Sequence, residues 1–353
     1  MSANPADRDG QLRSTLKNAD ISYGSDSSGL ICSYLFAPEQ AGQAIDSAGA
    51  KRWLEAAGNA RSHEFIWLHF SLSNVNSTRW LGENMALPEE YFATMREGTG
   101  STRIERAEDC LIAVINDVVY EFSYDASQTA TLWMCVHHNF VVSARLHPLR
   151  SVDRLQGSIK AGEQIDSPVF LLAHLLRDQA DVLQQIARQA TVQVDQIEDR
   201  LLAGSGDAKR STLGALRRPL VRLRRLLAPE PGALFRLLSQ VPPWFDESDA
   251  QELRAATEES AIVLSDLSTL EERIKLLQEE MSAQTTEQTN RSLFLLTMVT
   301  VLALPINIIA GFFGMNVGGI PLAENPLGFW IIAAIVASFC AVAGWYAFFK
   351  QQE

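Results

Sequence analysis

The sequence predicts an α/β cytoplasmic domain followed by a long stalk helix and two C-terminal transmembrane helices. Short β-like runs alternate with helical segments up to about residue 150, a heptad pattern starts near residue 246, and two uncharged apolar runs end the chain. We expect the α/β domain at residues 1–166, a helical bundle with the stalk helix at 167–290, and the membrane domain at 291–353.

Composition limits the classes of function. Of the 353 residues 47% are hydrophobic, which excludes a mostly disordered chain. The 30 Lys and Arg against 42 Asp and Glu give a net charge of −12, which argues against nucleic acid and makes cations the expected partners. Four scattered cysteines indicate reduced thiols. The polar N-terminus lacks an apolar signal segment, so we expect the bulk of the chain in the cytoplasm.

The first domain is predicted from five β-like runs between Gly29 and Leu146, namely GLICSYLF, FIWLHF, CLIAVI, TLWMCV and FVVSARL. Polar segments with helical patterns at 41–60 and 88–97 favour an α/β or α+β domain over a sandwich. No dinucleotide-binding, P-loop, nucleophile-elbow or HExxH motif occurs, so we expect neither an enzyme nor a cofactor.

One pair of histidines is a candidate metal site. His137 and His138 are adjacent between two strand runs, where a solvent-facing hairpin turn is the favoured interpretation and a zinc site is the alternative. The other histidines show no ligand spacing: His63, His69, His147 and His174.

Two helices of different character follow the sheet domain. The first opens at Ser167 and runs to about Leu202, where GSGD breaks it. The second, Ala208–Leu227, carries seven Lys and Arg and no acid, with Pro219 inside it. A link rich in Pro and Gly, containing APEPG and VPPWF, comes next.

A third helix starts near Asp246 and has eleven acids against three bases up to Glu280. The opposite charges of the second and third helices suit packing within one bundle. Alternatively, an acidic helix face repeated around an oligomer concentrates divalent cations near a pore mouth, and both interpretations can hold.

Heptads in the third helix predict packing against other helices and offer a surface for oligomerisation. No Pro or Gly interrupts the chain before Val301, so the helix should continue into the membrane. About 65 residues at 1.5 Å each would reach about 100 Å. The seam consists of Leu253, Ser260, Leu267, Ile274 and Met281, and of Ala256, Val263, Leu270, Leu277 and Gln284.

Two C-terminal runs, 292–313 and 327–349, contain no Asp, Glu, Lys, Arg or His. Each exceeds the roughly 20 apolar residues that span a bilayer, so two transmembrane helices are favoured over two buried helices of a soluble core. The 317–326 link between them is short and lacks Lys and Arg. Arg291 and Lys350 flank the pair, so both chain ends are expected in the cytoplasm.

Two spans cannot enclose a water-filled path, so conduction requires a ring of identical copies. One face of the first span alternates amide or hydroxyl groups with leucine, as expected of a pore wall that holds hydrated ions and closes by dewetting. The alternative is that Thr300 and Asn307 hydrogen-bond to neighbouring helices. The face consists of Asn290, Leu293, Leu296, Thr300, Leu304, Asn307 and Gly311.

The first span ends in Gly314-Met315-Asn316, preceded by Leu304-Pro305 and Ala310-Gly311. In this topology the tripeptide resembles that of the CorA-type divalent metal ion transporter superfamily, and GMN-VGGIPLAENPLGF is similar to its ZntB-like zinc transporter branch. The resemblance covers essentially the whole chain. It implies a funnel-shaped homopentamer in the bacterial inner membrane, with a pore lined by the first span.

In such proteins Gly314, Met315 and Asn316 would form the outer selectivity ring, and Asn316 would hold an ion that keeps most of its water. The cargo that the resemblance implies is Zn²⁺, taken up with the help of a proton gradient, with Ni²⁺, Cd²⁺, Co²⁺ or Mg²⁺ as further ions. Gly314 would let backbones approach closely, and Met315 would pack behind the ring.

Two departures from the magnesium-carrying members favour the zinc branch. Pro321 is followed by Leu322 where those members have Met-Pro-Glu, and Asn307 replaces a common threonine. Glu324 is the sole acid of the outer loop and is expected to attract cations. The spans hold no carboxylate or imidazole, so a group that responds to protons should lie in the cytoplasmic part or at Glu324. A Mg²⁺/Co²⁺ channel and a membrane-anchored metal-sensing scaffold are the competing functions.

Overall fold

The computed structural model describes residues 24–56, 64–98, 102–119, 129–203, 210–315 and 325–350. The chain divides into two compact units, Met1–Lys275 and Leu276–Glu353. The predicted domain boundaries after residues 166 and 290 stay predictions.

The first unit contains a seven-stranded mixed sheet with the order β2-β1-β3-β7-β6-β5-β4. The pair β3 and β7 is parallel, and all other neighbours are antiparallel. The strands are β1 (Leu30–Phe36), β2 (Gln43–Ala44), β3 (Phe65–Ser71), β4 (Arg103–Ala107), β5 (Cys110–Val118), β6 (Thr129–His137) and β7 (Phe140–Arg145).

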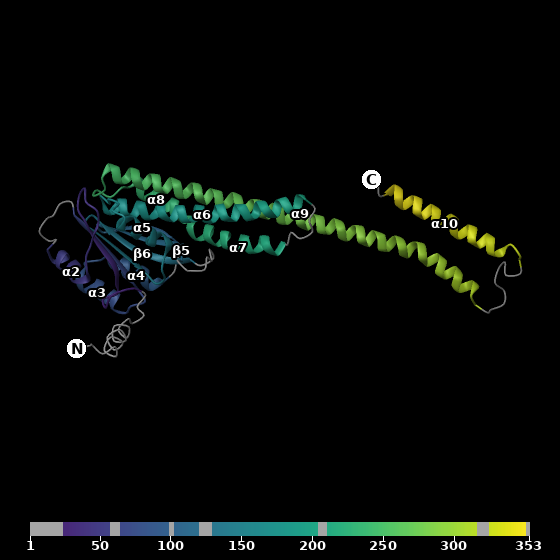
Figure 1. Cartoon of the computed structure of the whole chain (residues 1–353), viewed down its shortest axis with the longest axis horizontal. Helices are drawn as coiled ribbons and strands as arrows, with labels where there is room; N and C mark the ends of the chain where they lie inside the picture. The colour runs from purple at the N-terminus through teal and green to yellow at the C-terminus, as the bar shows by residue number, and fades with distance from the viewer. Residues whose placement is uncertain are drawn as a thin grey trace, which may run out of the picture. The chain divides into compact units, whose positions relative to one another are not determined.

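Helices cover both faces of this sheet (Figure 1). Strand side chains alternate between the faces, so Ile66 and Leu68 pack with α2 (Ser47–Ala56), α3 (Asn76–Asn84) and α4 (Glu89–Glu97). Phe65 and Trp67 join the opposite core. That core includes residues of α5 (Arg150–Lys160), α6 (Pro168–Leu202), α8 (Pro229–Ser239) and the start of α9 (Glu247–Phe313).

All five predicted strand runs are strands, which confirms a mixed α and β domain. The predicted helix that opens at Ser167 is α6, and the Ser167 hydroxyl accepts a 2.9 Å hydrogen bond from the Phe170 N–H as its N-cap. The expectation of a plain link after α7 (Arg210–Leu227) is wrong. Its APEPG segment opens α8, because proline is tolerated in a first turn, where its missing N–H has no intrahelical partner.

The predicted uninterrupted third helix is confirmed as α9, which ends at Phe313 where the first span was expected to end. Its heptad seam is buried from Leu253 to Leu277, which confirms helix-on-helix packing. The chain's own helices α6 and α7 already contribute ion pairs to α9, so this seam is not available to a second copy. The use of the seam for oligomerisation is therefore wrong for Leu253 to Leu277 and stays a prediction for half-buried Met281 and exposed Gln284.

Complementary charges join the bundle helices, as one of the two interpretations of the basic and acidic helices predicted. Arg273 of α9 lies 2.7 Å from Asp195 of α6 and also contacts Glu198. Arg224 of α7 lies 2.8 Å from Glu271 of α9. Each pair is partly exposed and adds at most about 1 kcal/mol, so the buried seam dominates the stability of the bundle.

Candidate functional site

The predicted pore face lies on one side of α9 in the second unit. All seven of its residues, from Asn290 to Gly311, are exposed in the single chain. Some side chains away from this face, including Phe294, Met298 and Ile309, are half-buried, whereas others such as Leu295 and Val299 are exposed as well. The whole span is therefore open to a bilayer or to other copies.

Polar groups on this face differ in what they contact. The Thr300 hydroxyl donates a 2.9 Å hydrogen bond to the Leu296 carbonyl of its own helix, so it does not need a neighbouring helix for a partner. Asn307 is exposed one turn beyond Leu304. Leu304 is 55% exposed, and it separates the two polar positions along the face.

Gly314 follows the last helical residues of α9. Its N–H donates a 2.9 Å hydrogen bond to the Ala310 carbonyl. A Cβ at Gly314 would lie 2.9 Å from that same oxygen, so a larger residue would force the helix end to move. Met315 is 51% exposed. Asn316 and Glu324, the predicted ion-binding amide and the outer-loop acid, lie outside the described residues.

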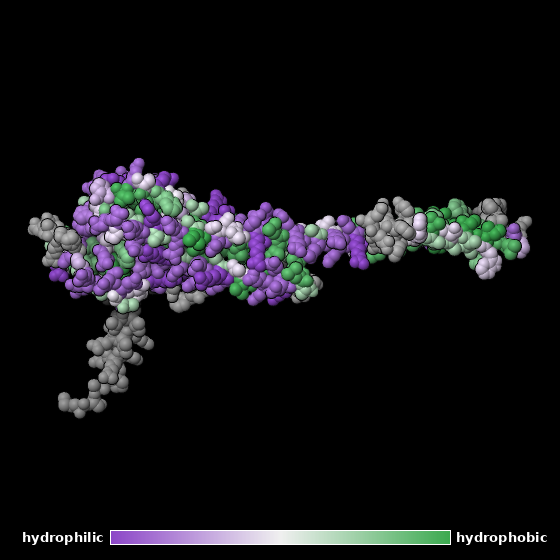
Figure 2. Space-filling model, turned by 90° about the horizontal axis from the view of Figure 1, so that it is seen from above, coloured by the Kyte–Doolittle hydropathy of each residue, from purple (hydrophilic) through white to green (hydrophobic). Residues whose placement is uncertain are grey.

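Two helices are long and apolar enough to cross a membrane, namely α9 and α10 (Gly328–Lys350). In the most apolar stretch of α9 no residue is buried, and in that of α10 only 6% are. Figure 2 shows hydrophobic side chains gathered over the helices of the second unit, whereas the first unit is mostly hydrophilic on the face shown. Such unburied apolar helices do not fit the core of a soluble protein, and a bilayer or other copies would cover them.

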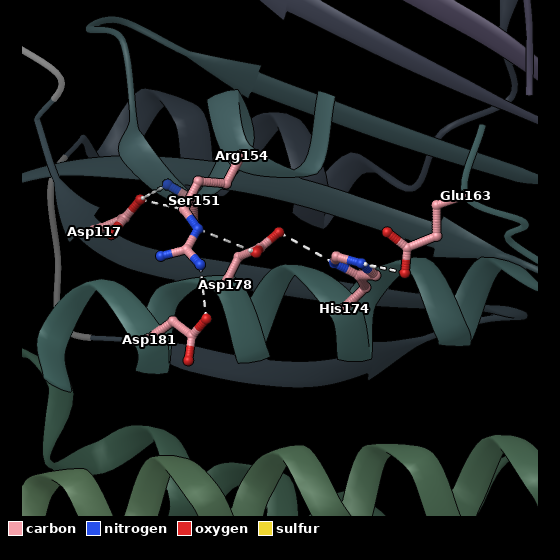
Figure 3. Close-up of polar contacts among 7 residues, drawn as sticks. All are labelled: Asp117, Ser151, Arg154, Glu163, His174, Asp178 and Asp181. Carbon is pink, nitrogen blue, oxygen red and sulfur yellow. Dashed lines mark hydrogen bonds and ion pairs between the residues drawn. The ribbon is translucent and has the colours of Figure 1, made fainter. Parts of the chain in front are cut away.

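A second candidate site lies in the first unit, where His174 of α6 stands between two carboxylates (Figure 3). Its Nδ1 lies 3.1 Å from Asp178 Oδ2 and its Nε2 lies 2.9 Å from Glu163 Oε1. The hydrogen bond with Asp178, aided by the charges of Asp178 and Glu163, raises the pKa of His174 although partial burial opposes the shift. Glu163 belongs to the turn between α5 and α6, so a charged imidazole ties that turn to α6.

The network extends along α6 to Arg154, and a separate pair of hydrogen bonds lies at the end of β5. Arg154 of α5 lies 2.7 Å from Asp181 and 3.5 Å from Asp178. Asp117, at the end of β5, accepts hydrogen bonds of 3.0 and 2.6 Å from the N–H and hydroxyl of Ser151 at the start of α5. Burial raises the pKa of Asp117, although the Ser151 hydrogen bonds oppose the shift.

His137 and His138 lie at the β6–β7 turn, as the favoured interpretation predicted. His137 Nδ1 lies 2.5 Å from Asn139 Oδ1 within that turn. Over the described residues no group of three or more His, Cys, Asp or Glu side chains could hold a metal ion. The sequence prediction missed the His174 site. The four-residue spacing of His174 and Asp178 on one helix could have predicted their contact from the sequence. Glu163 joins them only because of the α5–α6 turn.

Comparisons with known proteins fit this arrangement. Residues 62–351 match the family described as CorA-like Mg²⁺ transporter protein. The chain belongs to this CorA-like family. The resemblance stated from the tripeptide and the two spans is therefore confirmed at the level of the superfamily.

Relatives of this CorA-like chain carry two different names. It is 30% identical over 289 residues to the divalent cation transporter CmaX of Pseudomonas aeruginosa, covering 80% of this chain and 86% of the relative. It is 23% identical over 296 residues to the zinc transport protein ZntB of Yersinia enterocolitica, covering 84% of this chain and 88% of that relative.

Solved structures share the fold. The full-length CmaX protein aligns with a TM-score of 0.78 at 26% identity, covering 93% of this chain and 99% of that one. The CorA magnesium transporter of Methanocaldococcus jannaschii aligns with a TM-score of 0.68 at 19% identity, covering 89% and 96%. These neighbours confirm the predicted fold class of a sheet domain, a long helix and two C-terminal apolar helices.

Proposed function

We propose that this CorA-like chain transports divalent metal cations across the bacterial inner membrane, with both chain ends in the cytoplasm. The observation that carries the proposal is the uncharged face of α9, which is exposed over its whole length in a single chain. A homopentamer would turn five such faces toward one axis and enclose a path for hydrated ions.

The ion would be held at the outer end of α9. Gly314 and Met315 follow the last residues of the helix. The side-chain amide of Asn316, next in sequence, would accept hydrogen bonds from the water molecules around the ion. Small divalent cations lose water reluctantly, so a ring of amide oxygens suits a hydrated ion better than a dehydrated one. Glu324 in the outer loop would attract cations to this ring.

Zn²⁺ uptake is the cargo and direction that we propose. The similarity to a zinc transport protein supports the ion, and the inward pull of the membrane potential on cations supports the direction. Ni²⁺, Cd²⁺ and Co²⁺ would share the path. A Mg²⁺/Co²⁺ channel is the second candidate, favoured by the family match and by a magnesium transporter among the structural neighbours.

The test is metal flux into liposomes that contain the purified chain, with Zn²⁺ and Mg²⁺ offered singly and in competition. Asn316→Ala should reduce flux of the preferred ion by about ten-fold or more, because an ion-holding amide contributes on the order of 1–3 kcal/mol. Gln288→Ala, which removes an exposed amide from α9 before the first span, is the matched control and should leave flux unchanged. Equal flux in Asn316→Ala and wild type would overturn the ion-holding role of Asn316, and the absence of flux in wild type would indicate that the spans only anchor a metal-sensing scaffold.

We assign the response to protons to the network around His174. The network is remote in sequence from the spans, so it would act as a sensor of cytoplasmic pH that sets the transport rate rather than as a carrier of protons. Replacing Glu163 and Asp178 should remove the dependence of flux on a pH gradient, and replacing Glu324 alone should leave it. An intact dependence in the Glu163 and Asp178 variants would contradict this assignment.

A further inference from the structure

Helix α7 presents a row of arginines to solvent. Arg218, Arg222 and Arg225 are exposed and lie at helical spacings of four and three, so they share one side of the helix. The other basic side chains near them face inward, where Arg217 and Arg224 lie 3.7 and 2.8 Å from Glu271 of α9. Within the described residues none of the three outer arginines has an ion-pair partner.

Helix α9 presents the opposite charge on its outer side. Asp266 and Glu272 are exposed there, together with Glu258 and Glu259 nearer the sheet domain. Ile262, which is 62% exposed, lies among these acids. Glu272 has a 3.9 Å contact with Lys275 of its own helix, which leaves this side acidic overall from 258 to 272.

Both rows lie at the same height along the bundle. Helices α6 and α9 run in the same direction, because Arg177 pairs with Glu252 and Glu198 pairs with Arg273. Helix α7 returns alongside them, since only a short connection separates it from α6 (Figure 1). The pairs that Glu271 makes with Arg217 and Arg224 place the arginine row level with residues 266–272 of α9.

We propose that the arginine row of α7 docks on the outer acidic side of α9 in a second copy of this chain. A rotation about an axis along the helices preserves height, so the arginine row would lie level with Asp266 and Glu272. The arginines span about 10 Å and the two acids about 9 Å along their helices, and the acids lie about 120° apart around α9, so the row would approach α9 between them.

The charge pattern is compatible with a ring. One side of the interface is basic and the other acidic, so each copy can offer its arginine row to one neighbour and its acidic side to another. Head-to-tail contacts of this kind close into a ring when the rotation between copies closes. The inference rests on the proposed function, because it supplies the contact that a ring around the α9 axis requires.

The test uses zero-length carbodiimide coupling, which joins lysine amines to carboxylates but does not couple arginine. The full-length chain with Arg218→Lys and Arg225→Lys, purified in detergent and in lipid, should give covalent dimers and larger species on a denaturing gel. Adding Asp266→Asn and Glu272→Asn should abolish the increase over wild type. Arg52→Lys with Arg106→Lys, two exposed positions on the sheet domain, is the matched control and should give none.

Charge reversal gives an independent measurement. Arg218→Glu, Arg222→Glu and Arg225→Glu together should lower the mass of the purified assembly or its resistance to salt, and Asp266→Lys with Glu272→Lys should restore it in the combined variant. If the triple variant fails to fold, Asp266→Lys with Glu272→Lys alone should cause the same loss. Failed rescue, or binding of the arginines to anionic vesicles without coupling between copies, would overturn the proposal.

The outcomes separate this interface from the proposed function. An oligomeric, transporting chain whose lysine variant gives no additional covalent dimers overturns the interface and leaves transport standing. A chain that is monomeric in detergent and in lipid overturns both.

Discussion

His174 is the residue whose surroundings give it the clearest response to pH. Its folded-state pKa is raised by Asp178 and Glu163, so the protonated form is favoured by folding. The stabilisation is present in full below the unfolded pKa of about 6.5 and is lost as pH rises through the higher folded value.

His174→Gln should therefore lower the melting temperature of the full chain more at pH 5.5 than at pH 8.5. The same variant should flatten the pH dependence of metal flux. His147→Gln, at an exposed position outside the network, is the control for both measurements. A loss of stability that is equal at both pH values would show that the imidazole acts only through packing.

Glu230 of α8 is a buried carboxyl that opposes stability at alkaline pH. Burial, and the charge of Asp117, raise its pKa to about 8, although a 3.4 Å hydrogen bond from Gln179 Nε2 favours the ionised form. Gln179 Oε1 is buried without a partner among the described residues, and a protonated Glu230 brings an O–H donor to the same neighbourhood.

Because the folded pKa is raised, the stabilisation from protonated Glu230 is complete below about pH 4.5 and declines until pH passes about 8. Glu230→Gln should remove this decline, which is worth on the order of a few kcal/mol, and should raise the melting temperature most at pH 8.5. Glu105→Gln, on the exposed side of β4, is the control. An unchanged pH profile in Glu230→Gln would assign the alkaline loss to other groups.

Among the elements, those with strong apolar patterns were predictable and those with mixed patterns were not. The five strand runs and α9 are defined by apolar periodicity, and the structure places them within a few residues of the prediction. The edge strand β4, with sequence RIERA, buries only Ile104 and Ala107, and its charged residues hide it from a search for apolar runs. The prolines in the first turn of α8 led to the prediction of a link where the structure has a helix.

The candidate site was predictable only in part for the same reason. The predicted pore face rests on a 3.6-residue period along one helix, so it needs only local sequence, and it stays a prediction. The network joins Arg154, Glu163 and His174 from α5, a turn and α6, and only the tertiary fold brings them together. The acidic face of α9 was predicted from its eleven acids, but its height relative to the arginines of α7 required the tertiary fold.

At the level of the element, the seam of α9 should dominate the stability of the first unit. Leu267 is fully buried in it. Leu267→Ala should cost about 2–5 kcal/mol because it leaves a cavity between packed helices. Val192→Ala on α6, where the side chain is 55% exposed, should change stability by no more than about 0.5 kcal/mol. Chemical unfolding of the full chain, followed by helix signal, measures both, and equal costs would contradict a seam packed inside each chain.

At the scale of the whole molecule, the charged residues and the uncharged membrane spans occupy different parts of the sequence. Acids concentrate in the first unit and give the chain its negative charge, whereas the spans have none. A hydrated cation on an uncharged path must be admitted by amides and hydroxyls and stopped by apolar rings. Leu304 lies between Thr300 and Asn307 on the predicted pore face of α9, which makes it the apolar side chain of that face nearest to both polar groups.

Leu304→Ser should therefore raise the resting leak of cations through liposome-embedded protein, because a ring of hydroxyls wets where a ring of leucines does not. Leu295→Ser changes a leucine of similar exposure on another side of the same helix, 57% against 55%, and should leave the leak unchanged. The comparison distinguishes a pore wall from a lipid-facing surface, because both variants place the same hydroxyl in the same span. A greater leak from Leu295→Ser than from Leu304→Ser would mean that the axis of the assembly lies on the other side of α9.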